Sequence, residues 1–559
     1  MIRPRLFFDL PVLYHRRGTR LECSSITFIF FILFISLGAK AQSDVPAAGE
    51  MIYRQGLLPS GEVLRGEREA GAEVKGSDAA CVNCHRRSGL GSVEGRITIP
   101  PITGKYLFQV GSRNTARDNP SAQAPTLNQG PYTDVTLARA IREGIGADGR
   151  TLSYLMPRFK LDDAAMAALT LYLKSLTNDA VPGVTDDTLH FATIITPDAD
   201  PVKRKAMLDV LERFFADKNE FIRGGARRLQ SSREIMYRVT RKWQLHVWQL
   251  SGPPDTWQEQ LHQRLLAEPV FAVISGLGGA NWAPVHAFCE REAIPCLLPN
   301  VDLPVVAEQD FYPVYFSKGA LLEAELMSHE IRDNKAHLGL HHVIQIFRKG
   351  DIGEAAAKAV HTAMSPIGLK VTNYELKGGK EKQELVKSLR QVRAGDVLIL
   401  WLRPEDLASL PTTTTQSSVV YVSGLMGGLE SSPLPPAWRA IAHLTYPFDL
   451  PQLRRFRMNY PLGWFRIRQV QVVDERVQSD TYLACSILAE TLGEMLDSFV
   501  RDYLVERVEV MLSHRLITGY YPRLGLAPGQ RFASKGGYIV HFAEAQGARL
   551  VADSAWITP

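Results

Sequence analysis

One short motif in the sequence has residue types and a spacing that support a definite chemistry: Cys81-Val-Asn-Cys84-His85. Two thiols at this spacing can add to the vinyl groups of a haem, and the adjacent imidazole can reach the iron from the same turn. The motif predicts one covalently bound haem c on Cys81 and Cys84, with His85 as an axial iron ligand. The alternatives are a disulfide or half of a zinc site, although zinc requires a second ligand pair and none lies nearby in the sequence.

A second residue, Met156, has the chemistry expected of the other axial ligand. It directly precedes Pro157, ahead of the last helical pattern in this part of the chain. A thioether is a soft ligand that suits haem iron and raises its reduction potential relative to two histidines. Packing in the core is the alternative interpretation of Met156. It is the one we favour for Met166, which falls inside an apolar helical stripe.

The elements that must position these residues form a small, mostly helical block, residues 42–178. Helical periodicity covers residues 135–143 and 162–176, and loops rich in Gly and Pro fill much of the rest. In and around the haem motif, short stretches with a distinctive pattern of Gly, Pro and aromatic or aliphatic residues occur at residues 52–56, 76–85, 100–104, 137–149, 156–157 and 168–173. On these residues the block resembles the class I, mono-haem cytochromes c. The resemblance implies an all-α domain in which Cys81, Cys84, His85 and Met156 hold the haem.

The sequence contains no second haem motif, and Met156 would fill the sixth coordination position of the iron. Both features favour electron transfer without bond chemistry at the iron, so we expect a carrier and not an enzyme. We interpret the pair Arg86-Arg87, which follows the motif, as a solvated surface pair, and the alternative is contact with a haem propionate.

The first 41 residues have the order of a secretory signal: a basic region, an apolar run from Ile26 to Gly38, and then Ala39-Lys-Ala41. We expect cleavage after Ala41 and a periplasmic protein without a stable membrane span. An uncleaved anchor is the alternative, although the apolar run is shorter than the roughly 20 residues of a spanning helix. These 41 residues hold six Lys and Arg against two Asp and Glu. The rest of the chain is nearly neutral, which gives no argument for nucleic-acid binding.

A linker rich in turn-forming residues, 179–187, separates the helical block from a larger one, residues 188–559. There, apolar strand-like runs alternate with amphipathic segments, and the alternation restarts near residue 314. This pattern predicts two α/β lobes, each a largely parallel sheet flanked by helices. One long helical pattern at residues 479–511 and a hairpin at residues 538–556 complete the block.

The order of these elements resembles the type I periplasmic binding proteins of the branched-chain amino acid or amide class. In that family two lobes close over a small ligand, and the loop after the third strand donates hydrogen bonds to a ligand carboxylate. The resemblance implies ligand contacts from Ser275, Gly278 and Asn281 in that loop, and from Ser423 in the second lobe. The alternative for each is a tight strand-to-helix turn that touches no ligand. Two further cysteines, Cys289 and Cys296, flank a predicted turn, where a local disulfide is an open possibility in an oxidising compartment.

Three hypotheses for the function follow. The first is a periplasmic electron carrier whose α/β module docks a redox partner protein or senses a small polar ligand such as an amino acid or amide. The second is a solute-binding protein of a transport or sensing system that carries an accessory haem. The third is the electron-accepting subunit of a periplasmic quinoprotein dehydrogenase.

Overall fold

The computed structural model describes residues 47–69, 71–94, 97–109, 130–176, 181–228, 241–307, 309–495 and 498–559. The predicted signal, residues 1–41, and the start of the predicted linker lie outside the described residues. Contacts divide the chain into two units: Met1–Asn83 with Gln129–Ser175, and Cys84–Asn128 with Leu176–Pro559. By this division, residues 84–109, which the sequence assigns to the small block, belong with the large unit.

Helices dominate the first unit, as predicted. Residues 47–55 are helical, and they are followed by η1 (Gly76–Ala79), α5 (Asp134–Glu143) and α6 (Asp163–Ser175). A capping box between Thr133 and Thr136 begins α5, and Gly144, with φ of 72°, ends it. Gly49 lets the first helix approach α6, because a Cβ there would lie 2.3 Å from the backbone oxygen of Ala168. A small antiparallel sheet adds to the helices, in the order β2 (Glu73–Lys75), β1 (Arg65–Glu67), β5 (Arg158–Phe159).

The second unit begins inside the haem motif, at Cys84, because the contacts assign Cys81 to Asn83 to the first unit. Helix α2 (Val82–His85) crosses this boundary, and an antiparallel hairpin of β3 (Ser92–Glu94) and β4 (Ile97–Ile99) and helix α3 (Gly104–Phe108) follow it. We call residues 84–109 the haem segment.

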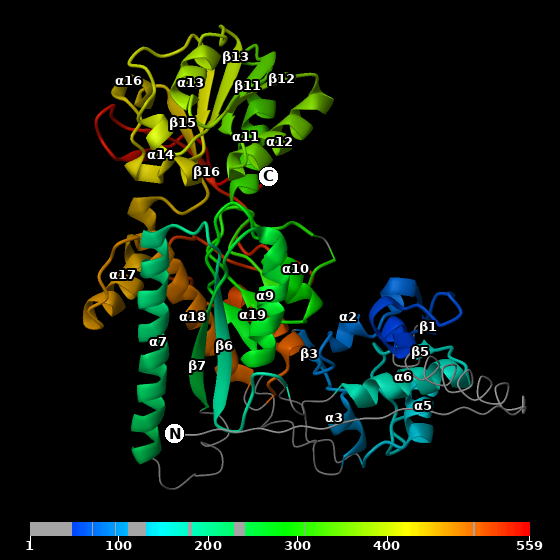
Figure 1. The fold of residues 1–559 in the computed structure, drawn as a ribbon. Coiled ribbons are helices and arrows are strands. Elements are labelled where there is room, and N and C mark those ends of the chain that lie inside the picture. The colour runs from blue at the N-terminus through cyan, green and yellow to red at the C-terminus, as the bar shows by residue number, and fades with distance from the viewer. Residues whose placement is uncertain are drawn as a thin grey trace, which may run out of the picture. The chain divides into compact units, whose positions relative to one another are not determined.

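The first lobe of the second unit is a parallel sheet in the order β10-β9-β8-β6-β7 (Figure 1). All three residues of the central strand β8 are buried, as expected for a parallel sheet covered on both faces. The strands are β6 (Thr188–Ile195), β7 (Lys242–Gln249), β8 (Ala272–Ile274), β9 (Cys296–Leu297) and β10 (Pro313–Val314). The helices are α7 (Pro201–Arg228), η2 (Pro254–Thr256), α9 (Trp257–Ala267) and α10 (Ala283–Arg291).

The second lobe is a seven-stranded sheet in the order β12-β11-β13-β14-β15-β16-β17, in which only β16 runs antiparallel to its neighbours, β15 and β17. The strands are β11 (His342–Arg348), β12 (Lys370–Leu376), β13 (Asp396–Trp401), β14 (Val419–Val422), β15 (Ala442–Tyr446), β16 (Tyr538–Phe542) and β17 (Leu550–Ala552). The helices are α11 (Ala320–Asn334), α12 (Ile352–Met364), η3 (Ser365–Ile367), α13 (Glu381–Leu389), α14 (Pro404–Leu407), α15 (Gly424–Gly427), η4 (Leu429–Ser431) and α16 (Pro436–Arg439). The two sheets confirm the predicted pair of α/β lobes.

Three helices lie between β15 and β16 of the second lobe and return to the first lobe: α17 (Pro451–Ile467), α18 (Glu475–Met495) and α19 (Arg501–His514). Figure 1 shows them beside α7 and β6 at the first lobe. The prediction of one continuous helix over residues 479–511 is wrong. The chain turns before α19, and this turn buries Phe499 against Phe271, with ring centroids 6.1 Å apart.

Candidate haem site and its anchorage

The haem motif lies on one helical turn. Cys81 directly precedes α2, and Cys84 and His85 end it. Arg86 then has a φ of 65°, so the chain reverses immediately after the histidine. The backbone N–H of Gly91 donates to the carbonyl of His85 over 3.1 Å, and the hydroxyl of Ser92 donates to that of Cys84 over 3.1 Å. The local hydrogen bonds therefore fix the position of the two residues that end the motif.

The imidazole of His85 is oriented for iron. Its Nδ1 lies 3.0 Å from the carbonyl oxygen of Pro100, which selects the tautomer with the proton on Nδ1 and leaves Nε2 as the unprotonated donor. Burial lowers the pKa of His85 to about 4, so the ring is neutral at physiological pH. Two thiols and a neutral imidazole on one turn are the donor set that a haem c requires. Cys81, Cys84 and His85 therefore fit a covalently bound haem c.

Met156 belongs to the first unit, in a turn whose backbone N–H donates to the carbonyl of Ser153 over 3.0 Å. Its side chain is only partly buried, whereas Met166 is 5% exposed within α6. The core of the unit therefore accounts for Met166 but not for Met156. Its assignment as the sixth iron ligand stays a prediction.

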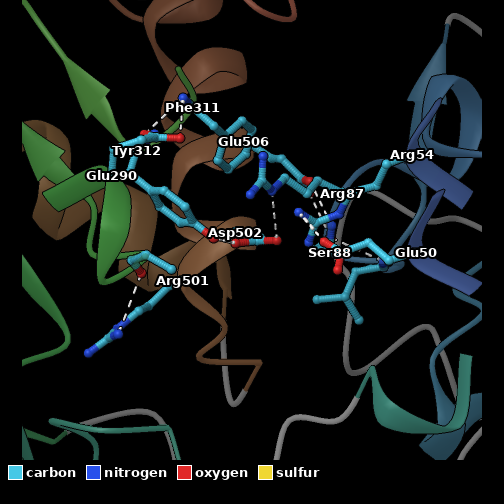
Figure 2. Close-up of polar contacts among 12 residues, drawn as sticks. Glu50, Arg54, Arg87, Ser88, Glu290, Phe311, Tyr312, Arg501, Asp502 and Glu506 are labelled. Carbon is cyan, nitrogen blue, oxygen red and sulfur yellow. Dashed lines mark hydrogen bonds and ion pairs between the residues drawn. The ribbon is translucent and has the colours of Figure 1, made fainter. Parts of the chain in front are cut away.

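The haem segment is tied to helix α19 through Ser88, three residues beyond the axial histidine (Figure 2). The backbone N–H of Ser88 donates to one carboxyl oxygen of Glu506 over 2.9 Å, and its hydroxyl donates to the other over 2.6 Å. Ser88 and Glu506 are each 3% exposed. Burial raises the pKa of Glu506 to about 7, although the Ser88 hydrogen bonds and Arg86 act in the opposite direction.

The two arginines that follow the motif extend this anchorage. Arg86 pairs with Glu509 of α19, a carboxylate that also receives Arg531. Arg87 lies 3.3 Å from Asp502 at the start of α19. The prediction that Arg86 and Arg87 form a solvated surface pair is wrong, because their side chains are only 18% and 23% exposed and each contacts a carboxylate.

An aromatic pair completes the contact with Arg87. Its guanidinium lies over the rings of Phe311 and Tyr312, 4.5 and 5.1 Å from their centroids. The hydroxyl of Tyr312 donates to Asp502, and the carboxylate of Glu290 accepts from the backbone N–H groups of both aromatic residues (Figure 2). The arginine therefore docks on a prearranged surface of the first lobe.

Sequence reasoning missed the three acceptors on α19. Asp502, Glu506 and Glu509 are spaced i, i+4 and i+7 and share one face of the helix. This face was visible in the sequence, but its partner lies more than 400 positions away, and no local pattern joins the two.

The predicted ligand loop of the first lobe is engaged by the chain itself. The hydroxyl of Ser275 donates to Thr481 of α18 over 3.0 Å and accepts from the amide of Asn300 over 3.0 Å. Gly278 is partly exposed, and the side chain of Asn281 caps the backbone of Ala283.

The backbone N–H groups that follow Gly278 are also satisfied internally. Ala280 donates to the carboxylate of Asp198 over 2.8 Å, and Gly279 donates to the hydroxyl of Thr196 over 3.2 Å. The N–H groups of Gly279 and Ala280 therefore donate to side chains of the protein itself. The family resemblance implies that N–H groups of this loop bind a ligand carboxylate.

The predicted residue of the second lobe, Ser423, is likewise buried in an internal network. Its hydroxyl donates to Glu323 of α11, which also accepts from the backbone N–H of Leu425 over 2.9 Å and the hydroxyl of Thr445 over 2.7 Å. Burial raises the pKa of Glu323 to about 7.

Between the lobes, charged side chains fill the cleft. Arg476 of α18 donates to Asp302 over 3.2 Å and lies 3.8 Å from Asp480. One cavity beside these side chains has a volume of about 20 Å³, which holds about one water molecule. The carboxyl oxygens of Asp480 have no hydrogen-bond partner among the described residues, and burial raises the pKa of this group to about 7.

Two cysteines lie in the core of the first lobe, on helix α10 and strand β9. The side chains of Cys289 and Cys296 are fully buried, and both are thiols in hydrogen-bonding contact. Burial, followed by that contact, raises the pKa of Cys289 well above its ordinary value.

Residues 69–177 match the family model for cytochrome c, so the chain carries a cytochrome c domain, and covalently bound haem c is the cofactor that such a domain implies. No curated protein matches the chain. Among the described residues, no helix has the length and apolar character needed to cross a bilayer.

Several solved structures resemble the part of the chain that contains the two α/β lobes. A fatty acid ABC transporter substrate-binding protein from Thermomonospora curvata is 16% identical, with 68% of this chain and 95% of that chain covered and a TM-score of 0.48. A leucine-binding protein from Thermotoga maritima is 10% identical, with 66% and 99% covered and a TM-score of 0.47. A branched-chain amino acid ABC transporter protein from Thermus thermophilus with bound valine is 12% identical, with 67% and 97% covered and a TM-score of 0.45.

Proposed function

We propose that this protein is a periplasmic mono-haem electron carrier whose α/β module serves as the rigid support of the haem segment and as the docking surface for a redox partner protein. The observation that carries this proposal is the anchorage of the haem segment on α19 through Ser88 and Glu506. A haem domain on a free linker would need no such buried contact.

The residues around the motif perform the positioning. Pro100 holds the ring of His85, and Ser88, Arg86 and Arg87 hold the turn that follows it. The bound haem supplies a one-electron couple, and Cys81 and Cys84 attach it covalently. A fixed ligand turn changes little between oxidation states, which favours transfer without bond chemistry. We assign the sixth position to Met156 and no enzymatic role to the chain.

The internal engagement of the cleft supports docking over solute capture. The hydroxyls of Ser275 and Ser423 both donate to side chains of the protein itself. Asp198 accepts a hydrogen bond from the backbone N–H of Ala280 in the predicted ligand loop. One observation favours the second candidate, a solute-binding function: the buried carboxyl oxygens of Asp480 accept no hydrogen bond from the described residues, although Arg476 lies 3.8 Å away. Such a group would suit a small hydrogen-bond donor that enters when the lobes open.

The test combines two measurements on the haem-loaded protein. A carrier with Met156 on the iron stays six-coordinate when reduced, so carbon monoxide should leave its visible spectrum unchanged. A thermal-shift screen of amino acids, amides and small alcohols should give no hit, because tight binding raises apparent stability by mass action. Carbon monoxide binding would argue for chemistry at the iron, and a strong ligand hit would favour solute capture.

A further inference from the structure

Helix α17 carries an exposed apolar stripe. Leu453, Phe456, Tyr460 and Ile467 are 54%, 80%, 56% and 74% exposed. Their separations of three, four and seven residues put them on one face of the helix. Scattered exposed apolar residues are ordinary, but a continuous stripe of this kind marks an interaction surface.

The opposite face of α17 fixes the helix in place. On that face Met458 and Phe465 are buried in the core. Trp464 borders the stripe, four residues after Tyr460, and packs against Phe214 of α7 with ring centroids 5.9 Å apart. The indole N–H of Trp464 also donates to Asp217 of α7 over 3.0 Å. The stripe is therefore held outward by packing and does not result from a loose helix end.

The charge around the stripe has one sign. Residues 451–473 contain five Arg and no Asp or Glu. At about 100° per residue, Arg455 and Arg466 lie on one flank of the stripe, and Arg457 and Arg468 lie on the other. The second pair meets Asp449 and Asp217. Arg455 and Arg466 are exposed and have no ion-pair partner in the part of the chain that the structure describes.

We propose that this face of α17 binds an anionic phospholipid surface, with the helix in the plane of the interface. From Leu453 to Ile467 the apolar side chains extend over about 21 Å of helix. Aromatic and aliphatic side chains along one line, with arginines on both flanks, are the composition of an interfacial helix. The exposed arginines would contact lipid phosphates while the stripe enters the boundary of the acyl chains.

A second copy of the chain fits the same face less well. A two-fold contact puts identical surfaces together, so the arginines of one α17 would face those of the other without a carboxylate. Two parts of the chain outside the described residues, 110–129 and 229–240, each hold two Arg and a single Asp or Glu. Neither supplies the negative charge that the arginines require.

The test is co-sedimentation of the full exported protein, with haem attached, on vesicles of phosphatidylcholine with and without phosphatidylglycerol. We expect binding to the anionic vesicles that weakens as salt is raised. Arg455→Gln with Arg466→Gln should lower the partition constant roughly 30-fold, because each arginine near an anionic surface contributes about fivefold. Phe456→Ser with Ile467→Ser should abolish sedimentation.

The matched control is Leu266→Ser with Leu516→Ser, two side chains that are 64% and 67% exposed but lie outside α17. This pair should bind like the parent. Equal binding to both kinds of vesicle, or no effect of either α17 double variant, overturns the proposal. A parent dimer that Phe456→Ser with Ile467→Ser dissociates would assign the face to a second copy. Binding to an acidic redox partner but to neither vesicle would assign it to a protein.

Discussion

The contact between Ser88 and Glu506 should have a measurable interaction energy, because it joins the haem segment to α19. Ser88→Ala removes the hydroxyl that donates to a carboxyl oxygen over 2.6 Å and leaves that oxygen buried. Hydrogen bonds to charged groups contribute about 1.5–3 kcal/mol, and an unsatisfied buried acceptor costs about 1–3 kcal/mol. We expect Ser88→Ala to lower the free energy of unfolding of the haem segment by about 2 kcal/mol at pH 8.

A double-mutant cycle isolates the contact. In Glu506→Gln the side chain still accepts from the backbone of Ser88, so Ser88→Ala should cost less in that background, with a coupling energy of about 1–2 kcal/mol. The control is Ser513→Ala, whose hydroxyl donates to a carbonyl of its own helix. It should be additive with Glu506→Gln to within about 0.5 kcal/mol.

The assay is urea unfolding with two probes. Haem absorbance reports on the segment that carries His85, and all eight tryptophans, from Trp243 to Trp556, lie in the α/β part of the second unit. We expect the two transitions to coincide in the parent protein, and the haem transition to shift to lower urea in Ser88→Ala. Separate transitions in the parent, or a coupling energy below about 0.5 kcal/mol, would refute the anchorage.

Three further predictions concern other residues. Met156→Ala should remove the weak near-infrared band of a methionine bound to ferric iron, and an unchanged spectrum would reject Met156 as the ligand. Cys289 and Cys296 should resist alkylation in the native protein and both react in denaturant without reductant, because burial raises the pKa of Cys289; a lack of reaction in denaturant would indicate a disulfide. For Glu323, the folded pKa of about 7 exceeds the ordinary value of 4.5. Stability is therefore fully present below about pH 4.5 and is lost as pH rises towards 7, by up to about 3 kcal/mol. Glu323→Gln should flatten this dependence of the melting temperature, and an unchanged slope would contradict the assignment.

The sequence predicted the features that depend on local pattern. The spacing of Cys81, Cys84 and His85 is a chemical requirement, and the alternation of strands and helices in the second block follows from which residues must be buried. Helix α5 also begins and ends within a residue of the predicted range.

The features that depend on distant partners could not be predicted. Ser88 and Glu506 are 418 positions apart, and nothing local to either indicates the other. The pair Arg86-Arg87 was interpreted as solvated because charged residues usually are, and only the tertiary structure supplies the carboxylates and rings that cover it. The same holds for Ser275, whose hydroxyl meets Thr481 from a helix that is remote in sequence.

The most direct test of the electron-carrier proposal is a spectroelectrochemical titration of the exported full-length protein. We predict one covalently bound haem per chain and a reversible one-electron transition, with a six-coordinate, low-spin spectrum in both oxidation states. A chain without a covalent haem, or a reduced state with an open coordination position, would contradict it.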